Sequence, residues 1–166
     1  MFSIDVSNLH WATEGDDPDD LCAHGEMVAI IGDERFEFNG TASATALYLL
    51  KTLTENHSFG KDNQMMPCCG HFYIPNESLD NVQISGCNNG VDWEVTHIDN
   101  KVKIKTETGK EVFVDSEDYK EEVFNFADKV EFFYKSCSEK KLPDDKYDRD
   151  GYIAFWNEWN KRRYGK

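Results

Sequence analysis

The sequence predicts an α+β fold, with an antiparallel β-meander sheet and about three helices packed mainly on one face. Between Val82 and Val114, short segments alternate apolar and polar residues and are separated by breaks rich in Asn, Asp and Gly. This pattern is typical of β-hairpins. Three other stretches carry apolar residues at helical spacing. The strands and helices are also grouped along the chain, which favours α+β over alternating βαβ units. A chain of 166 residues is long enough for one core, so we expect a single domain over residues 1–166.

The meander is expected to consist of the segments VQISGC, VDWEVTHI, VKIKTE and EVFV. A two-residue turn at Asp99-Asn100 would determine the register by counting. One face would then pair Trp93 with Thr106, Val95 with Ile104 and His97 with Val102, and the other Glu94 with Lys105 and Thr96 with Lys103. The first face carries the apolar residues, so it should be buried with Trp93 in the core.

Further strands are expected earlier in the chain, at Phe2–Val6, Glu26–Ile31, Arg35–Phe38 and HFYIP (71–75). Gly32-Asp33-Glu34 lies between the second and third of these and predicts a hairpin turn. Residues 56–70, NHSFGKDNQMMPCCG, have no periodicity and are expected to form a long loop. Long loops in compact domains are often functional.

The three helices are expected at 41–55, from 115 onward, and at 151–163. Thr41 should cap the first, whose apolar stripe consists of Ala46, Leu49, Leu50 and Leu53. The stripe of the second consists of Tyr119, Val123, Phe126, Val130, Phe133 and Cys137, widened by Phe124, Phe132 and Tyr134. Asp148 or Asp150 should cap the third, which is lined by Tyr152, Phe155, Trp156 and Trp159.

The chain is strongly acidic, with 32 acidic and 18 basic residues and a net charge of −14. This charge argues against nucleic acid or an anionic membrane as a partner, because both would repel the protein. Residues 1–40 hold ten acids and one arginine, a net charge of −9, and residues 13–20 read TEGDDPDD. Such asymmetry either serves solubility or forms an acidic docking face for a basic protein.

The chain has no apolar run of 18 residues, so we expect no transmembrane helix. Its N-terminus lacks a basic start and an apolar signal core, which predicts no secretion signal. Five cysteines without framework spacing are typical of free thiols. Together these features predict a cytoplasmic protein.

Two motifs resemble metal sites, and neither has the spacing of one. Cys68-Cys69-Gly70-His71 and the pair Cys22 and His24 offer zinc ligands, but structural zinc sites usually use Cys pairs two to four residues apart. Lys146–Asn157 overlays an EF-hand loop only in part, because a lysine and an asparagine occupy its first and last ligand positions. We therefore expect no metal and no cofactor.

No catalytic motif is visible: the chain has neither a nucleophile elbow nor a glycine-rich phosphate loop. Three features instead point to a class of small acidic binding proteins. They are the acidic 13–20 stretch, the VDWEVTHIDNKVKIKTETG meander and the terminal DRDGYIAFWNEWNKRR helix. In these features the chain resembles the immunity proteins of bacterial contact-dependent and polymorphic toxin systems. The resemblance implies a binding protein that neutralises a cognate toxin.

We therefore expect the protein to be an acidic protein-binding module that inhibits a basic toxin. A nuclease is the kind of toxin that we expect. The expected partner-binding residues are Glu14, Asp16, Asp17, Asp19, Asp20 and, as an apolar anchor, Trp11. Two alternatives stay open. One is a small-ligand-binding protein or enzyme that uses the 56–71 loop, which a deep pocket containing Cys69 and His71 would favour. The other is a structural subunit whose aromatic terminal helix is buried in a homodimer. We expect a monomer or a homodimer.

Overall fold

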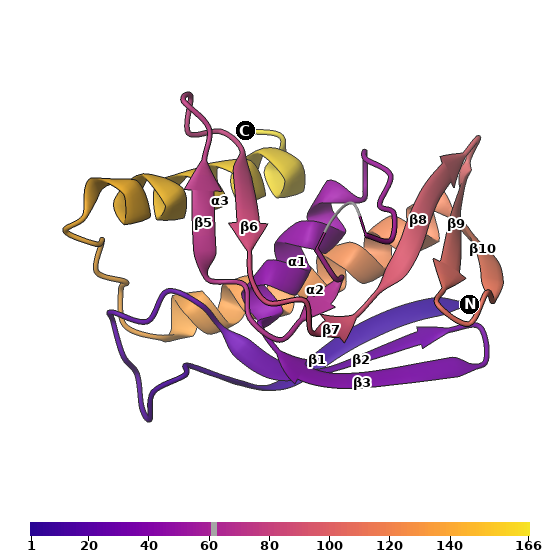
Figure 1. The fold of residues 1–166 in the computed structure, drawn as a ribbon, viewed down its shortest axis with the longest axis horizontal. Helices are drawn as coiled ribbons and strands as arrows, with labels where there is room; N and C mark the ends of the chain where they lie inside the picture. The colour runs from indigo at the N-terminus through magenta and orange to yellow at the C-terminus, as the bar shows by residue number, and fades with distance from the viewer. Residues whose placement is uncertain (61–62) are drawn as a thin grey trace.

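The computed structural model describes residues 1–60 and 63–166, which form an α+β fold of three helices and four small antiparallel sheets (Figure 1). The first sheet has the order β1-β2-β3, with bounds Phe2–His10, His24–Ile31 and Glu34–Gly40. It confirms the predicted hairpin, whose turn contains Gly32 at a φ of +68°. Strand β1 is longer than expected, because its pairing with β2 continues past an irregularity after Ser7 to His10.

The second sheet is the predicted meander, formed by β8 (Trp93–Ile98), β9 (Lys101–Thr106) and β10 (Glu111–Asp115). The register obtained by counting is confirmed at every predicted pair from Trp93↔Thr106 to His97↔Val102. Trp93 is fully buried, and Lys105 forms an ion pair with Glu94 at 3.5 Å on the opposite face. Asp99 has a φ of +53°, a left-handed turn conformation that aspartate adopts more readily than most residues.

The segment VQISGC does not belong to the meander, contrary to the prediction. Its strand β6 (Val82–Ser85) pairs with β5 (Phe72–Pro75), with Tyr73 opposite Ile84. Strand β5 is separated from β6 only by the 76–81 turn, so β6 pairs with it and not with β8. The loop after β6 then leads away from this hairpin. There β7 (Gly90–Val91) pairs with β4 (Met66–Pro67), a short strand inside the predicted 56–70 loop. Residues 61 and 62 of that predicted loop lie outside the described residues.

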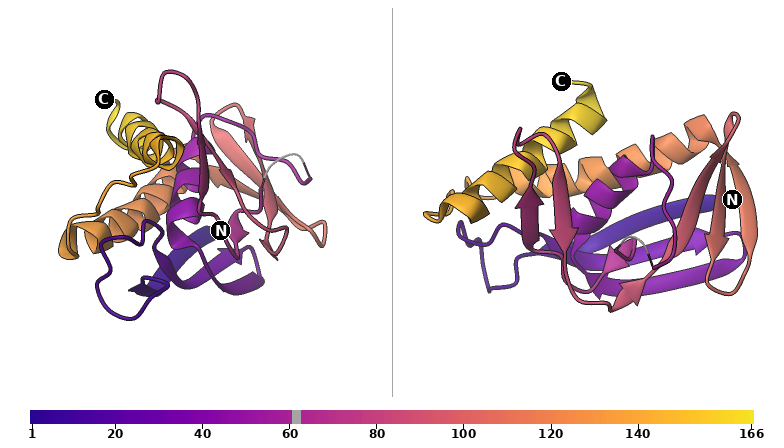
Figure 2. Two further views of the ribbon diagram at one scale, coloured as in Figure 1. Left: turned by 60° about the vertical axis from the view of Figure 1, so that its left-hand side comes forward. Right: turned by 45° about the horizontal axis from the view of Figure 1, so that its top comes forward.

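Helix α1 (Ala42–Lys51) is the centre of the molecule. It contacts β2, β4, α2 and α3, and both views of Figure 2 show it enclosed by the other elements. Apart from Tyr48, every residue from Ala42 to Leu50 is buried. The predicted four-residue stripe was therefore too narrow, because a helix apolar on all sides is a core helix. Thr41 is at the N-cap position, but its side chain does not cap the helix, and the helix ends four residues earlier than predicted.

Helix α2 (Ser116–Ser136) begins at the predicted place, where the Asp115 side chain accepts a hydrogen bond from Glu117 N–H. The predicted stripe is confirmed from Tyr119 to Val130 and packs against β1 and α1. The expectation that Phe132 widens the buried face is wrong. Its side chain is 73% exposed, on the side of the helix away from the core.

Helix α3 (Lys146–Tyr164) packs against β5. Its N-cap is Asp145, whose side chain accepts from the N–H groups of Tyr147 and Asp148, so the predicted caps Asp148 and Asp150 were wrong. Phe155 stacks on Tyr73 at a centroid distance of 4.9 Å. None of the helices described is long and apolar enough to cross a membrane.

Candidate functional site

The predicted acidic loop meets a second acidic segment at one end of the molecule. Residues 12–21 lie against residues 137–150, which comprise the connection from α2 to α3 and the first residues of α3, on the left of Figure 1. Asp16 Oδ2 accepts from Ser138 N–H at 2.6 Å, and Lys141 N–H donates to Pro18 O at 2.9 Å. We call residues 12–21 and 137–150 the acidic end. It holds ten carboxylates and four basic side chains, a net charge of −6.

Three of the predicted steering aspartates also accept hydrogen bonds that shape the acidic end: Asp17 and Asp20 within their own loop, and Asp16 from the 137–150 segment. Asp20 accepts hydrogen bonds from the N–H groups of Ala12 and Cys22, at 2.6 and 3.1 Å. Hydrogen bonds from Asp19 N–H and the Thr13 hydroxyl lower the pKa of Asp17. The N–H group of Ser138 likewise lowers the pKa of Asp16. The sequence indicated the charge of these residues, but gave no sign of this second role.

Trp11 is not an exposed anchor, contrary to the expectation. Its side chain is 3% exposed and packs on Phe133 at a centroid distance of 4.7 Å. The ammonium group of Lys140 covers the ring, 3.2 Å from its centroid, and also donates a hydrogen bond to Asp17 O. An indole enclosed in this way fastens the acidic loop to α2 and offers little surface to a partner.

Other apolar side chains are exposed close to the acidic end. Phe72 is 59% exposed, and Leu142 and Tyr147 are also exposed. Phe72 lines a cavity of about 580 Å³ together with Asp19, Asp20 and Asp148. An exposed aromatic ring therefore stands next to the carboxylates. The sequence prediction missed it because Phe72 belongs to an alternating strand whose exposed face could not be identified without the fold.

The same cavity contains the cysteines and histidines that the sequence singled out: Cys22, His24, Cys69 and His71. Burial raises the pKa of Cys22 to about 12, and its thiol lies 3.3 Å from the Tyr73 hydroxyl. Burial lowers the pKa of His24, so this ring is neutral at pH 7. A protonated buried thiol is a poor nucleophile. The chemistry present here therefore suits binding better than covalent catalysis.

A second group of thiols lies beside this cavity. The sulfur atoms of Cys68, Cys69 and Cys87 all lie within 4.8 Å of one another. We call these three residues the thiol cluster. A hydrogen bond between the side chains of Cys69 and Cys87 lowers the pKa of Cys87, and one between Cys87 and Cys68 raises the pKa of Cys68. All five cysteines are free. The sequence motif placed Cys68 and Cys69 beside His71, which is not part of the cluster, and gave no sign of Cys87.

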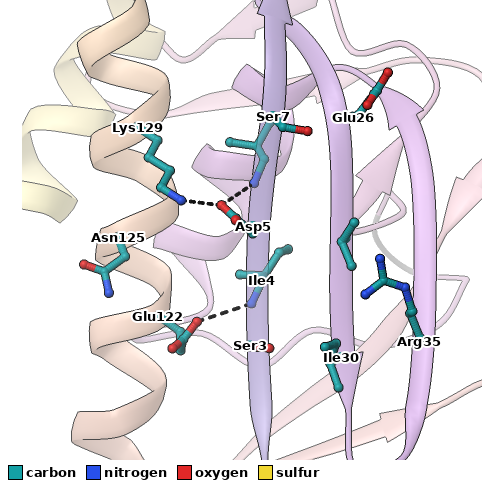
Figure 3. A pocket seen from close by; sticks show the side chains of 12 residues that line it. Ser3, Ile4, Asp5, Ser7, Glu26, Ile30, Arg35, Glu122, Asn125 and Lys129 are labelled. Atoms are coloured by element: carbon teal, nitrogen blue, oxygen red, sulfur yellow. Dashed lines mark hydrogen bonds and ion pairs between the residues drawn. The ribbon is translucent and has the colours of Figure 1, made fainter.

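A groove of about 490 Å³ separates α2 from the outer face of the first sheet (Figure 3). Its charged groups are used internally. Glu122 accepts from Ile4 N–H at 3.3 Å, Asp5 accepts from Val6 N–H at 2.8 Å, and Lys129 pairs with Asp5. These contacts satisfy backbone groups on the edge of β1 that would otherwise be open to another strand. The groove therefore protects an edge strand, and each charged side chain that lines it among the described residues already has a partner.

No protein-family model matches the chain, and neither a curated protein nor a solved structure shows significant similarity to it.

Proposed function

We propose that this protein is an acidic protein-binding module that neutralises a basic partner by direct binding, as a toxin-immunity protein does. A basic nuclease toxin is the expected partner, and the cytoplasm, which would keep the free cysteines reduced, is the expected compartment. The observation that carries the proposal is the acidic end. Two acidic segments more than 100 residues apart in the sequence converge there and leave a net charge of −6.

The rest of the surface supports the choice of a basic partner. Within the described residues, thirteen lysine and arginine side chains already form ion pairs with carboxylates. Few cations are therefore left to bind a phosphate backbone, while the surplus carboxylates remain. An acidic surface attracts a basic protein at long range and raises the association rate in a salt-dependent way.

Phe72 is the proposed anchor. Aromatic side chains that enter a pocket on a partner provide much of the binding energy of an interface, and surrounding charges at the rim mainly set the association rate. Phe72 is exposed and lines the same cavity as Asp19, Asp20 and Asp148. This arrangement assigns the two contributions to different residues, so they can be tested separately.

The charge test measures binding to the product of the adjacent gene, at low and high salt. Glu14, Glu139, Asp144 and Asp148 are exposed and make no side-chain hydrogen bond or ion pair within the part of the chain that the structure describes. Replacing them by Gln and Asn removes charge without disturbing the loop. We expect association to slow roughly tenfold at low salt and its salt dependence to flatten. The matched control neutralises four exposed carboxylates toward the other end: Asp99, Glu107, Asp118 and Glu121.

The anchor test uses Phe72→Ala in the same assay. Loss of about 2 kcal/mol at an anchor corresponds to dissociation about 30-fold faster, with the association rate nearly unchanged. Phe113→Ala is the control, because Phe113 is similarly exposed, at 54%, in strand β10 away from the acidic end. Equal effects of the two charge variants, or of the two Phe variants, would remove the acidic end from the mechanism. Absence of any basic partner would refute the proposal as a whole.

Small-ligand binding is the second candidate function, because the cavity that contains Cys69 and His71 exists and measures about 580 Å³. That volume suits a small molecule. A thermal-shift screen of metabolites, repeated on His71→Ala, would test this reading. The homodimer reading has less support, since Phe155 and Trp159 of the aromatic helix are fully buried within the chain itself. Sedimentation would distinguish a monomer from a homodimer.

A further inference from the structure

The thiol cluster is built from two segments that the fold holds side by side. Cys68 and Cys69 follow β4, and Cys87 lies in the connection from β6 to β7. The pairing of β4 with β7 aligns the segments, and Cys68 N–H donates to Asn89 O at 2.8 Å. Cys87 N–H donates to the sulfur of Cys69 at 3.0 Å. The two segments are thus joined by backbone contacts on both sides of the sulfur atoms.

Two glycines allow this close approach. A Cβ atom at Gly86 would lie 2.0 Å from Cys69 O, and one at Gly90 would lie 2.4 Å from Met66 O. No side chain fits at either distance, so only glycine lets the 86–90 segment touch the backbone that carries Cys68 and Cys69. The convergence of the three thiols therefore depends on specific residues in both segments.

From this geometry we propose that Cys68, Cys69 and Cys87 bind a thiophilic d¹⁰ metal ion, Zn²⁺ or Cu⁺, through three thiolates. A Zn–S bond of about 2.3 Å requires sulfur atoms roughly 3.8 Å apart. The sulfur atoms already lie within 4.8 Å of one another, so small side-chain rotations are sufficient. The expectation that the protein binds no metal was based on the sequence spacing of Cys68 and Cys69 alone. The fold brings Cys87 to them as a third ligand.

The composition of the cluster selects the ion. It contains only sulfur, and thiolates favour soft metals such as Zn²⁺ and Cu⁺ over Mg²⁺ or Ca²⁺. Within the described part of the chain, no carboxylate or imidazole joins the group. Cys87 is exposed, so a fourth position would face solvent. Three-coordinate thiolate binding suits Cu⁺, whereas Zn²⁺ would complete a tetrahedron with a water molecule. The proposal is independent of the proposed binding of a basic partner.

The first experiment titrates the reduced full-length protein with Co²⁺, a spectroscopic probe for tetrahedral thiolate sites, and then displaces it with Zn²⁺. Cu⁺ is tested separately, in competition with a chromogenic chelator. We expect one ion per chain and a sulfur-to-cobalt charge-transfer band. The ratio of the two affinities shows whether the three thiolates prefer Cu⁺ or Zn²⁺. Failure of the reduced wild-type protein to bind any of the three ions would overturn the proposal.

The ligand set is tested with Cys68→Ser, Cys69→Ser and Cys87→Ser. Each should weaken binding by about 100-fold or more, because loss of a direct ligand costs more than the 10–100-fold effect of losing an outer hydrogen-bond partner. Cys137→Ser and His71→Ala are controls outside the cluster and should bind like wild type. Circular dichroism and the melting temperature of each variant would establish that it is folded. Unchanged binding by Cys87→Ser, or loss of binding in His71→Ala, would refute the three-thiolate site.

Discussion

The two ends of the molecule are built by different means. At one end, β8, β9 and β10 form a meander in which neighbours in sequence pair with each other through short turns. Away from it, segments from distant parts of the chain meet: the acidic loop meets the α2–α3 connection at the other end, and β4 pairs with β7 near the middle of the molecule. In Figure 1 the meander lies on the right, β7 near the middle and the acidic end on the left.

The comparison teaches where local patterns carry information. Between β8 and β9, one turn and a period of two residues determine every cross-strand neighbour. In the loop-built regions, the neighbours depend on close approaches at Gly86 and Gly90 and on side chains such as Asp16 that cap distant N–H groups. Regular hydrogen bonding stabilises the meander, whereas single contacts hold the loop-built regions. The candidate sites lie in the loop-built regions, which agrees with the tendency of function to reside in loops.

The largest expected effect is at the meander end. Trp93→Ala removes a fully buried indole that packs against Phe2, with ring centroids 6.2 Å apart. It should lower the free energy of unfolding by about 3–5 kcal/mol, because the cavity cannot be refilled. Urea denaturation measures this effect. Trp93→Phe should cost clearly less, since the Trp93 N–H has no hydrogen-bond partner among the described residues. A loss below about 1 kcal/mol for Trp93→Ala would mean that the meander contributes little to the core.

The corresponding test beyond the meander is at Glu158, which is 1% exposed. Its carboxylate accepts from Val82 N–H at 2.7 Å and pairs with Lys51 at 3.2 Å and Arg162 at 2.8 Å, joining α3 to β6 and α1. Glu158→Ala leaves the buried Val82 N–H without its acceptor, whereas Lys51 keeps its hydrogen bond to Val82 O and Arg162 keeps its ion pair with Glu55. We expect a loss of about 2–3 kcal/mol by urea denaturation. Glu117→Ala, which breaks an exposed pair with Lys120, should cost under about 1 kcal/mol. Equal losses would show that the buried network is dispensable.

The sequence predicted the fold class, the meander register and the stripe of α2, because each follows from periodicity and turn residues. It did not predict that β6 pairs with β5, since two antiparallel partners satisfied the same alternation. Of the candidate sites, charge composition identified the acidic loop. Burial of Trp11 and exposure of Phe72 depend on which face each strand turns to the core. The meeting of Cys87 with Cys69 is a tertiary contact between segments that lack a shared period.

The smallest expected effect concerns the turn between β5 and β6. Hydrogen bonds from the Asn76 amide and the Ser78 hydroxyl, at 2.7 and 2.6 Å, lower the pKa of Asp80 to about 2. A carboxylate with a depressed pKa in the folded state contributes stability above its unfolded pKa, near 4, and loses it as the pH falls toward 2. Asp80→Asn should therefore lower the melting temperature by about 2 °C or less at pH 6, because the group is exposed. The difference from wild type should shrink between pH 4 and pH 2. A difference that is constant over this range would mean that the Asp80 carboxylate does not stabilise the turn.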